Sequence, residues 1–429
     1  MAIGCGQPLT MPPPWSTCVP PHLDRYRAAG GCLTGPFVCI MFVMTSHASC
    51  ITAPPPNGPL HRDAVPPARG RAAGLNTPNR HETVRLEVLG DWYDRIAEQQ
   101  PDGRQVVTEV HRDHSRTVIN RVDSPDVGFD WSVNPYRGCE HGCIYCYARP
   151  DHERLGFSAG LDFETKIIAK VDAPALLEKE LARPAWRGEP IAMAGVTDVY
   201  QPVERKLEIT RGCLGVMAAC GQPVSITTKS GLITRDLDLL SRLAARDAVR
   251  VAISITTLDP TLAAALEPRA AAPNRRLETI RELAEAGIPV SVMVAPVIPG
   301  LTEWEMAPIL EAAADAGARG SGYIMLRLPE PVKALFADWL HRHRPQAAAG
   351  ILGRIRQVRG GQLNDATFGR RMRGQGHRAA QVQGMFEVLR RRHGLDRGIG
   401  RPSSRAFAPP RTTGNKAKPE GQLPLFGPG

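Results

Sequence analysis

The feature that most constrains the fold is an alternation of strand-like and helix-like segments between residues 164 and 328. Beta-branched runs bounded by turn residues are followed by amphipathic stretches with helical spacing. The expected strands are 164–171, 190–196, 223–229, 249–257, 289–297 and 321–328, and the expected helices are 174–183, 206–220, 235–246, 277–287 and 305–317. Such alternation indicates parallel strands joined by right-handed crossovers. Residues 131–329 are too few for a complete eight-unit barrel of roughly 250 residues, which favours an incomplete α/β barrel.

Three thiols stand close together before most of this alternation. Cys139, Cys143 and Cys146 form a C-x3-C-x2-C run in a turn-rich segment, where Gly138 and Gly142 let the backbone wrap around a small group. Thiolates are soft ligands suited to an iron–sulfur cluster, and a 4Fe-4S cluster bound by three cysteines keeps one iron open for a substrate or cofactor. The alternatives are three unrelated core cysteines or a structural zinc site completed by a nearby histidine, His141 or His152.

The segment around these cysteines resembles the signature of the radical S-adenosylmethionine (radical SAM) superfamily, C-x3-C-x-aromatic-C, with Tyr145 at the aromatic position. The wider block, residues 119–129 and 134–152, resembles the DNA repair photolyase-like branch, whose members are related to spore photoproduct lyase. The resemblance implies a partial (β/α)6-type barrel with a 4Fe-4S cluster and S-adenosylmethionine as cofactors. It also implies reductive cleavage of S-adenosylmethionine to a 5′-deoxyadenosyl radical, with a reducing flavodoxin or ferredoxin as electron donor.

Polar residues follow the expected strands, at the edge where ligands bind in such sheets. Thr197 and Asp198 resemble the loop that meets the amino group of the cofactor, although Asp198 also suits a helix cap. Lys229 and Ser230 are similar to the Thr-Lys-Ser strand end of the branch, and Lys229 is there expected to pair with a carboxylate or to remain a solvated surface lysine.

The later strands add further candidates for cofactor binding. Ser254 and Thr256 share one face of the strand 249–257, so their hydroxyls could bond a ribose or simply be ordinary strand residues. Arg269 is a candidate for the cofactor carboxylate through its planar fork. Residues 296–303 resemble the superfamily's adenine-binding element G-x-I-x-G-x-x-E, with Pro296 in place of the first Gly. The resemblance implies that Ile298 packs on the adenine and that Gly300 permits the turn; the alternative is a plain strand-to-helix loop.

The remaining chain divides by composition. We expect a disordered Pro- and Gly-rich extension over 1–79 and a lead-in over 80–130, with a helix at 83–100 and a strand at 106–111. The core follows over 131–329. After it we expect a basic helical region over 330–398, with helices at 331–345 and 379–394, and a flexible tail over 399–429. Cys213 and Cys220 lie on an expected core helix and are interpreted as packed residues rather than hydrogen donors.

The net charge of +10 is concentrated near the C-terminus. Residues 341–429 hold 18 Lys and Arg against 4 Asp and Glu, a balance of +14, so the preceding residues carry about −4. A basic C-terminal region suits nucleic acid or is a solvated basic tail. The longest apolar run, 37–44, is far shorter than the roughly 20 residues of a membrane span, and we expect a cytoplasmic protein with no membrane segment.

Near the end of the sequence stand Gln422, Leu423, Pro424, Leu425 and Phe426. This peptide resembles the Q-L-x-L-F motif by which bacterial replication and repair proteins bind the sliding clamp, which implies the clamp as a partner.

These features together predict a radical SAM enzyme that acts on nucleic acid and catalyses a lyase reaction of the kind used to repair DNA. One alternative is modification of RNA or protein by the same radical. Another is a non-catalytic module that binds nucleic acid or the clamp and uses its metal structurally.

Overall fold

A computed structural model describes residues 68–74, 76–81 and 106–410, all within one compact unit, Pro55–Gly429. The expected helix at 83–100, the clamp-like peptide and most of the predicted N-terminal extension lie outside the described residues. No helix in the described ranges is long and apolar enough to cross a membrane.

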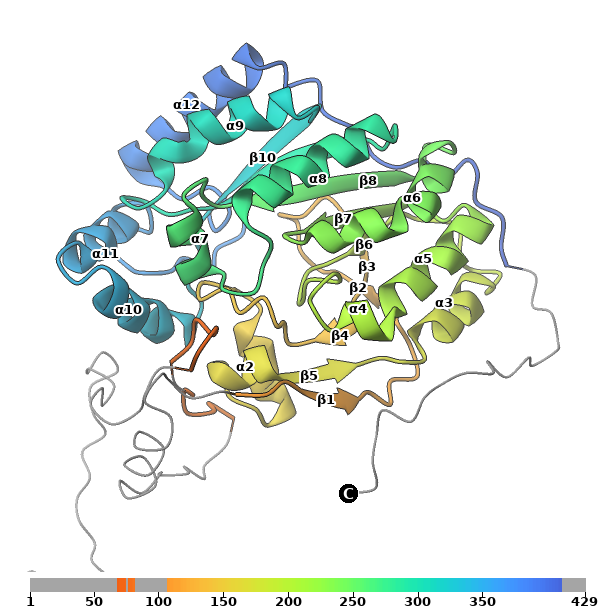
Figure 1. The fold of residues 1–429 in the computed structure, drawn as a ribbon, viewed down its shortest axis with the longest axis horizontal. Coiled ribbons are helices and arrows are strands. Elements are labelled where there is room, and N and C mark those ends of the chain that lie inside the picture. Colours follow the sequence, from red (N-terminus) through yellow and green to blue (C-terminus); the bar gives the residue numbers. More distant parts are fainter. Residues whose placement is uncertain (1–67, 75, 82–105, 411–429) are drawn as a thin grey trace, which may run out of the picture. The chain divides into compact units, whose positions relative to one another are not determined.

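A seven-stranded sheet forms the centre of the molecule (Figure 1). Its strands, in sheet order, are β10 (Gly320–Met325), β9 (Val290–Val297), β8 (Val249–Ile255), β7 (Val224–Thr228), β6 (Ile191–Met193), β3 (Trp131–Val133) and β2 (Ile119–Arg121). All neighbours are parallel except β2, which runs antiparallel to β3. Six parallel strands in an open sheet confirm the predicted partial (β/α)6-type barrel.

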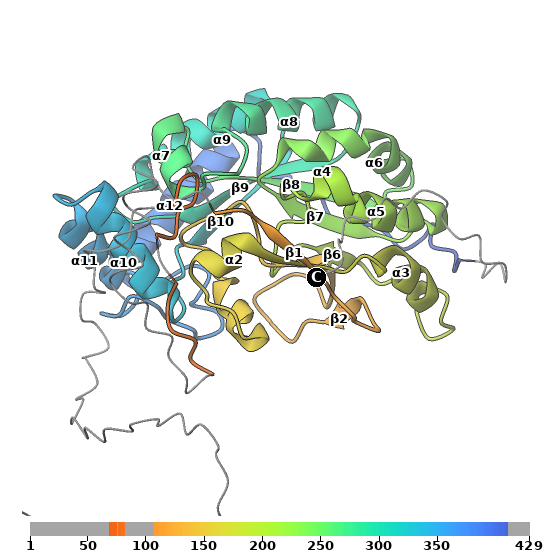
Figure 2. The same ribbon diagram turned by 60° about the horizontal axis from the view of Figure 1, so that its bottom comes forward.

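Helices between the strands cover one face of this sheet (Figures 1 and 2). They are α3 (Ala173–Leu181), α4 (Glu204–Leu207), α5 (Ile209–Cys220), α6 (Leu237–Ala244), α8 (Pro273–Glu285) and α9 (Met306–Asp315). The short α7 (Pro260–Leu266) follows β8 and packs instead in the apolar cluster that contains Cys143 and Tyr145. The predicted helix 206–220 is interrupted at Glu208, whose φ of 50° breaks the helical path between α4 and α5. Cys213 and Cys220 are buried on α5, in agreement with the packing role expected of them.

A second, three-stranded sheet differs from the prediction. β5 (Lys166–Ala169) was expected in the series of barrel strands, but it pairs with β1 (Glu109–Arg112) and with β4 (Tyr136–Arg137). The short β3 takes the first place in the barrel instead. The connection from β3 to β6 therefore carries β4, the cysteine run, the 3-10 helix η1 (Arg149–Leu155), α2 (Leu161–Thr165), β5 and α3.

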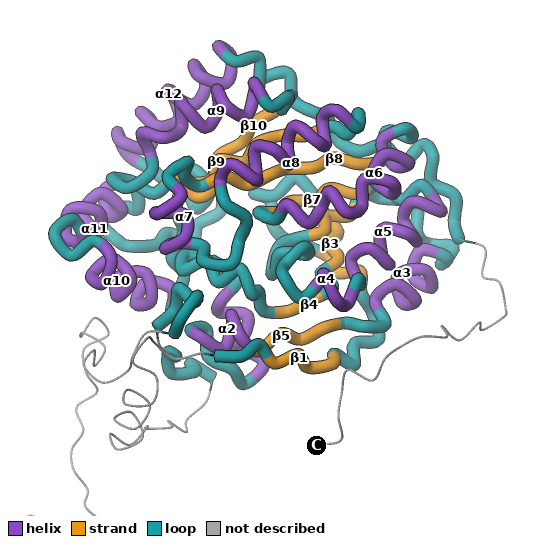
Figure 3. Tube along the Cα trace, viewed as in Figure 1, coloured by secondary structure: helices purple, strands orange, loops and turns teal. Residues whose placement is uncertain are grey.

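The C-terminal region is helical, as Figure 3 shows. It contains α10 (Val332–His343), α11 (Ala348–Gln357) and α12 (Gly376–Arg392). The sequence predicted α10 and α12, whereas α11 was not expected. Two short 3-10 helices, η2 (Gly231–Asp236) and η3 (Glu303–Glu305), follow β7 and β9.

Candidate functional site

The three cysteines lie in a tightly turned loop directly after β4. Backbone hydrogen bonds from Gly142 N to Cys139 O (3.2 Å) and from Cys146 N to Cys143 O (3.1 Å) form two successive turns. Gly138 and Gly142 have φ of 76° and 67°, the left-handed region that the predicted wrapping requires. Cys139 and Cys143 are buried, and Cys146 is half-buried.

Burial raises the pKa of all three thiols, and the pKa of Cys139 is raised further by Asp198 and then by the other two cysteines. Holding the three groups as thiolates therefore requires a cation. Iron supplies such a cation, so the donor set fits an iron–sulfur cluster. Within residues 68–74, 76–81 and 106–410, no three Cys, His, Asp or Glu side chains are grouped as a single metal ion requires. A cluster binds each cysteine through a different iron.

A buried ion pair supports the backbone of this cysteine loop. Arg149 and Glu164 are both fully buried and lie 2.6 Å apart. The Arg149 guanidinium also donates to the carbonyls of Gly142 (3.1 Å) and Cys143 (2.9 and 3.0 Å). Further bonds to Ala159 O and Gly160 O use its remaining donors. The pair therefore fixes the backbone that carries the cysteines.

Residues before the barrel complete the same support. The Glu164 carboxylate accepts the backbone N–H groups of Ala72 (3.2 Å) and Ala73 (3.0 Å), and Arg71 donates to Glu164 O (2.6 Å). Ala72 and Ala73 are buried. The expectation that residues 1–79 are disordered thus does not hold for 68–74 and 76–79, because buried polar partners satisfy their backbone.

The loop after β6 holds the cysteine loop from the other side. Thr197 donates its hydroxyl to Gly138 O (2.6 Å) and accepts from the amide of Gln201 (3.0 Å), while Gln201 accepts from Glu140 N (2.9 Å). Thr197 therefore acts on the backbone of the cysteine loop. Gln201, which sequence reasoning did not select, is fully buried and shares this role.

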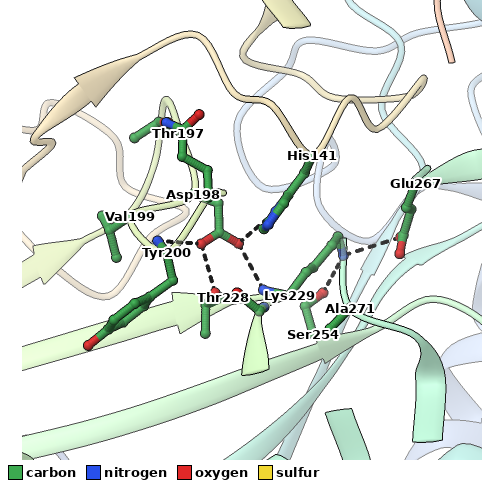
Figure 4. A network of polar contacts seen from close by, with 12 residues as sticks. His141, Thr197, Asp198, Val199, Tyr200, Thr228, Lys229, Ser254, Glu267 and Ala271 are labelled. Carbon is green, nitrogen blue, oxygen red and sulfur yellow. Dashed lines mark hydrogen bonds and ion pairs between the residues drawn. The ribbon is translucent and has the colours of Figure 1, made fainter. Parts of the chain in front are cut away.

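Asp198 is the centre of a polar network (Figure 4). Its carboxylate accepts from Thr228 Oγ1 (2.7 Å), Lys229 N (2.8 Å) and Tyr200 N (2.9 Å), and it lies 3.3 Å from His141 Nδ1. Burial raises the pKa of Asp198, but His141 and the hydrogen bonds outweigh burial and lower this pKa to about 2. The helix-cap alternative is wrong, because α4 begins after Val203 and has no side-chain cap.

Lys229 joins the ends of three strands. Its ammonium donates to Ser254 Oγ (2.7 Å), Thr256 Oγ1 (3.4 Å) and Ala295 O (2.9 Å). Only 13 % of the Lys229 side chain is exposed, so it is not a solvated surface lysine. Ser254 and Thr256 share one face of β8, as predicted, and the lysine brings them together.

A buried carboxylate that the sequence did not identify completes this group. Glu267 lies 3.6 Å from Lys229 Nζ and is paired with Arg276. It also accepts from Tyr145 Oη and from Thr256 Oγ1 (2.6 Å). Burial raises the pKa of Glu267, but Arg276, Lys229 and the hydroxyl groups outweigh it and lower this pKa to about 2. The signature aromatic residue is thereby tied to the strand ends.

Arg269 and Ser230 face a different space. Arg269 lies 3.2 Å from Glu140 Oε1 and lines a cavity of about 550 Å³ together with His141 and Ser230. Arg205, Arg235 and Arg275 also line it. The Ser230 hydroxyl accepts from Leu232 N (3.2 Å) and caps η2. Within the described part of the chain, no hydrogen bond or ion pair joins the side chain of Arg269 or Ser230 to the side chains around Lys229.

The segment after β9 has the expected turn. Gly300 has φ of 78°, and a Cβ there would lie 2.6 Å from Arg354 Cδ. Ile298 is fully buried and belongs to the same apolar cluster as Cys143 and Tyr145. The structure therefore places Ile298 in the same apolar core as the cysteine loop and the signature aromatic residue.

Comparison with known proteins identifies the family. Residues 133–313 match the radical SAM superfamily. An uncharacterized protein of Mycobacterium tuberculosis is 39 % identical over 246 residues, which cover 57 % of this chain and 71 % of that protein. An uncharacterized protein of Methanocaldococcus jannaschii is 27 % identical over 197 residues, covering 46 % and 71 %. Spore photoproduct lyase complexed with dinucleoside spore photoproduct has a TM-score of 0.49 and 17 % identity, over 66 % of this chain and 78 % of that chain. This chain belongs to the radical SAM superfamily, whose members bind a 4Fe-4S cluster and S-adenosylmethionine.

Proposed function

We propose that this protein is a radical SAM enzyme that acts on nucleic acid. The observation that carries the catalytic part is the cysteine loop itself: two buried thiols, Cys139 and Cys143, and the half-buried Cys146 sit on a backbone fixed by Arg149 and Thr197. The same loop contributes Tyr145, which contacts the polar group at the strand ends. Ligands for a cluster and polar groups for a second cofactor thus meet at one edge of the sheet.

The residues fit defined parts of the two cofactors. Cys139, Cys143 and Cys146 would hold the cluster. When bound, the cluster and S-adenosylmethionine supply a 5′-deoxyadenosyl radical after transfer of one electron.

Charge decides how the cofactor's methionine moiety would be oriented. Arg269, beside the cavity that His141 also lines, is the candidate cation for the carboxylate, and Lys229 is a second one; Asp198 offers an anion for the amino group. The Asp198 pKa of about 2 keeps its carboxylate ionised at neutral pH.

Hydroxyl and apolar groups would hold the nucleoside part. Ser254 and Thr256 present hydroxyls that could bond the ribose. Ile298 and the Gly300 turn supply an apolar contact and a close backbone approach for the adenine.

The proposal of a nucleic-acid substrate rests on charge and on the sequence block around the cysteines. Residues 341–429 carry a balance of +14, which favours a polyanion. The block resembles the DNA repair photolyase-like branch, so a lyase reaction on DNA is the specific form of this proposal. Modification of RNA or protein would need the same cofactors and is a separate outcome of the test.

Three further features belong to the proposal. We infer that a reduced flavodoxin or ferredoxin supplies the electron. The Gln422–Phe426 peptide would bind the sliding clamp. A cytoplasmic location agrees with the free thiols of Cys139, Cys143, Cys146, Cys213 and Cys220.

Isotope transfer tests the substrate class. The reconstituted enzyme would be incubated with deuterium-labelled DNA, RNA or total protein, and deuterium in 5′-deoxyadenosine would be measured by mass spectrometry. We expect uptake from DNA. Uptake only from protein would overturn the proposed substrate, whereas the assignment of the enzyme class would stand.

A further inference from the structure

A C-terminal segment bridges the two edges of the barrel sheet. We call residues 365–373 the strap. At one edge of the sheet, Met325 N on β10 donates to Met372 O (2.9 Å), and Arg373 donates to Tyr323 O (3.1 Å). Since β10 is an edge strand, the strap extends the barrel beyond its last strand.

The other edge of the sheet holds the opposite part of the strap. Asp126 follows β2 and accepts from Gly369 N (2.6 Å) and from Arg371 Nε (2.5 Å). Arg371 also donates to Ser124 Oγ (2.5 Å). Contacts to both β10 and the segment after β2 mean that the strap spans the gap between the sheet edges.

Arg359 locks the strap to β10. It is almost fully buried and donates to the carbonyls of Met325 (2.9 Å), the last residue of β10, and Leu326 (2.5 and 3.1 Å), which follows it. It also donates to the carbonyls of Arg370 (3.3 Å) and Arg371 (2.9 Å) in the strap. One side chain thus holds the strap in a defined position.

The strap presents an aromatic ring and a cation beside the cysteine loop. Phe368 is 51 % exposed, and the Arg371 guanidinium lies 4.3 Å from its ring centroid. Tyr147 directly follows Cys146, is 47 % exposed, and has Arg327 at 5.1 Å from its ring. We call these four side chains the aromatic–arginine surface.

Arg327 gives this surface an unbalanced positive charge. It is half-buried, lies over the Tyr147 ring and donates to the sulfur of Met372. Among the residues that the structure describes, no carboxylate forms an ion pair with it. Burial, and next the neighbouring Arg371, lower the pKa of Arg327. The nearby carboxylate of Asp126 is paired with Arg371. A partly buried cation that has no ion pair of its own fits an anionic ligand such as a phosphate.

We infer that the aromatic–arginine surface binds single-stranded nucleic acid, with an unpaired base stacked on Phe368 and a backbone phosphate at Arg327. Exposed aromatic rings alternating with arginines are the common means of holding unpaired bases and their phosphates. A base inside a duplex has no free face for stacking. This inference rests on the proposed nucleic-acid function and assigns the place and the strandedness of binding.

Fluorescence anisotropy with labelled oligothymidine, free or annealed to its complement, tests the inference. We expect the wild-type protein to bind the single strand more tightly. Phe368→Ala should weaken this binding roughly 5- to 150-fold, and Phe368→Trp, which keeps a stacking face, should retain it. Arg327→Gln should reduce the slope of log affinity against log salt by about 0.7, the value for one phosphate on a single strand.

Arg242→Gln is the matched control, because Arg242 is an exposed arginine on α6. It should leave both affinity and slope unchanged. Salt-dependent binding by the wild type that survives Phe368→Ala and Arg327→Gln would refute the surface and leave the nucleic-acid function intact. Absence of binding to either form, in a protein that still produces 5′-deoxyadenosine, would refute both. Tighter binding to the duplex would refute the stacked base.

Discussion

Arg149 is expected to be essential for the stability of the cysteine loop. Arg149→Met removes the cation opposite Glu164, and both side chains are fully buried. Loss of one partner from a buried ion pair costs about 3–5 kcal/mol, because the other charge stays buried without compensation. The carbonyls of Gly142 and Cys143 also lose their donor. The N–H groups of Ala72 and Ala73 still solvate Glu164, so we expect a loss of roughly 3–5 kcal/mol rather than more.

Urea unfolding of the cluster-free protein, followed by tryptophan fluorescence, measures this loss. Iron content after anaerobic reconstitution gives a second readout, and we expect it to fall with the stability. Arg149→Lys keeps the charge but cannot reach all of the carbonyls, so its loss should be smaller, about 1–3 kcal/mol.

Arg112→Met is the control for this prediction. Arg112 pairs with Asp172 at 2.9 Å, but the two side chains are 48 % and 58 % exposed. An exposed pair contributes about 0–1 kcal/mol. Equal losses in Arg149→Met and Arg112→Met, or full iron content in Arg149→Met, would refute the supporting role of the buried pair.

The other predictions concern the loop backbone, the buried carboxylates and the terminal peptide. Gly142→Ala should cost at least about 1 kcal/mol, since φ is 67° and the added Cβ would lie 2.7 Å from Glu164 Oε2. Gly215→Ala in α5, where a Cβ has open space, should instead stabilise by about 0.5–1 kcal/mol, and the same unfolding assay compares them. The folded-state pKa of Glu267 is about 2, below its ordinary value, so its stabilisation of roughly 3 kcal/mol is present above pH ~4.5 and is lost as the pH falls toward 2. Glu267→Gln should lessen that pH dependence between pH 5 and 3, and an unchanged profile would contradict the assignment. Deletion of residues 422–426 should abolish binding to the sliding clamp in a pull-down, and binding that survives the deletion would exclude the peptide.

The sequence was sufficient for most of the barrel because its longer strands carry β-branched residues at alternate positions between turns. β8 has Val or Ile at every second position, β9 has Val at Val290, Val292 and Val294, and such patterns are recognisable without tertiary information. β3 has three residues, too few for a periodic pattern, and β5 has the same composition as a barrel strand although it pairs in another sheet. Which strands β3 and β5 pair with is decided by contacts between distant parts of the folded chain, and these cannot be read from the local sequence.

In the candidate site, too, some residues could be predicted from the sequence and others could not. Lys229, Ser254 and Thr256 were predictable because parallel strand ends meet at one edge of a sheet. Glu267 and Arg276 were not, because neither has a motif and their role depends on mutual burial. Residues 68–74 look disordered in composition, and only the buried Glu164, more than ninety positions later, explains why they pack.

The central claim is that Cys139, Cys143 and Cys146 hold the cluster at which S-adenosylmethionine is cleaved. Its most direct test is the amount of 5′-deoxyadenosine formed by the anaerobically reconstituted protein with dithionite and S-adenosylmethionine. Cys213→Ala is the control, because Cys213 is a fully buried thiol on α5 outside the run. We predict formation by the wild type and by Cys213→Ala and none by Cys143→Ala. Formation that persists in Cys143→Ala, or a wild-type protein with a full cluster that never cleaves the cofactor, would contradict the account.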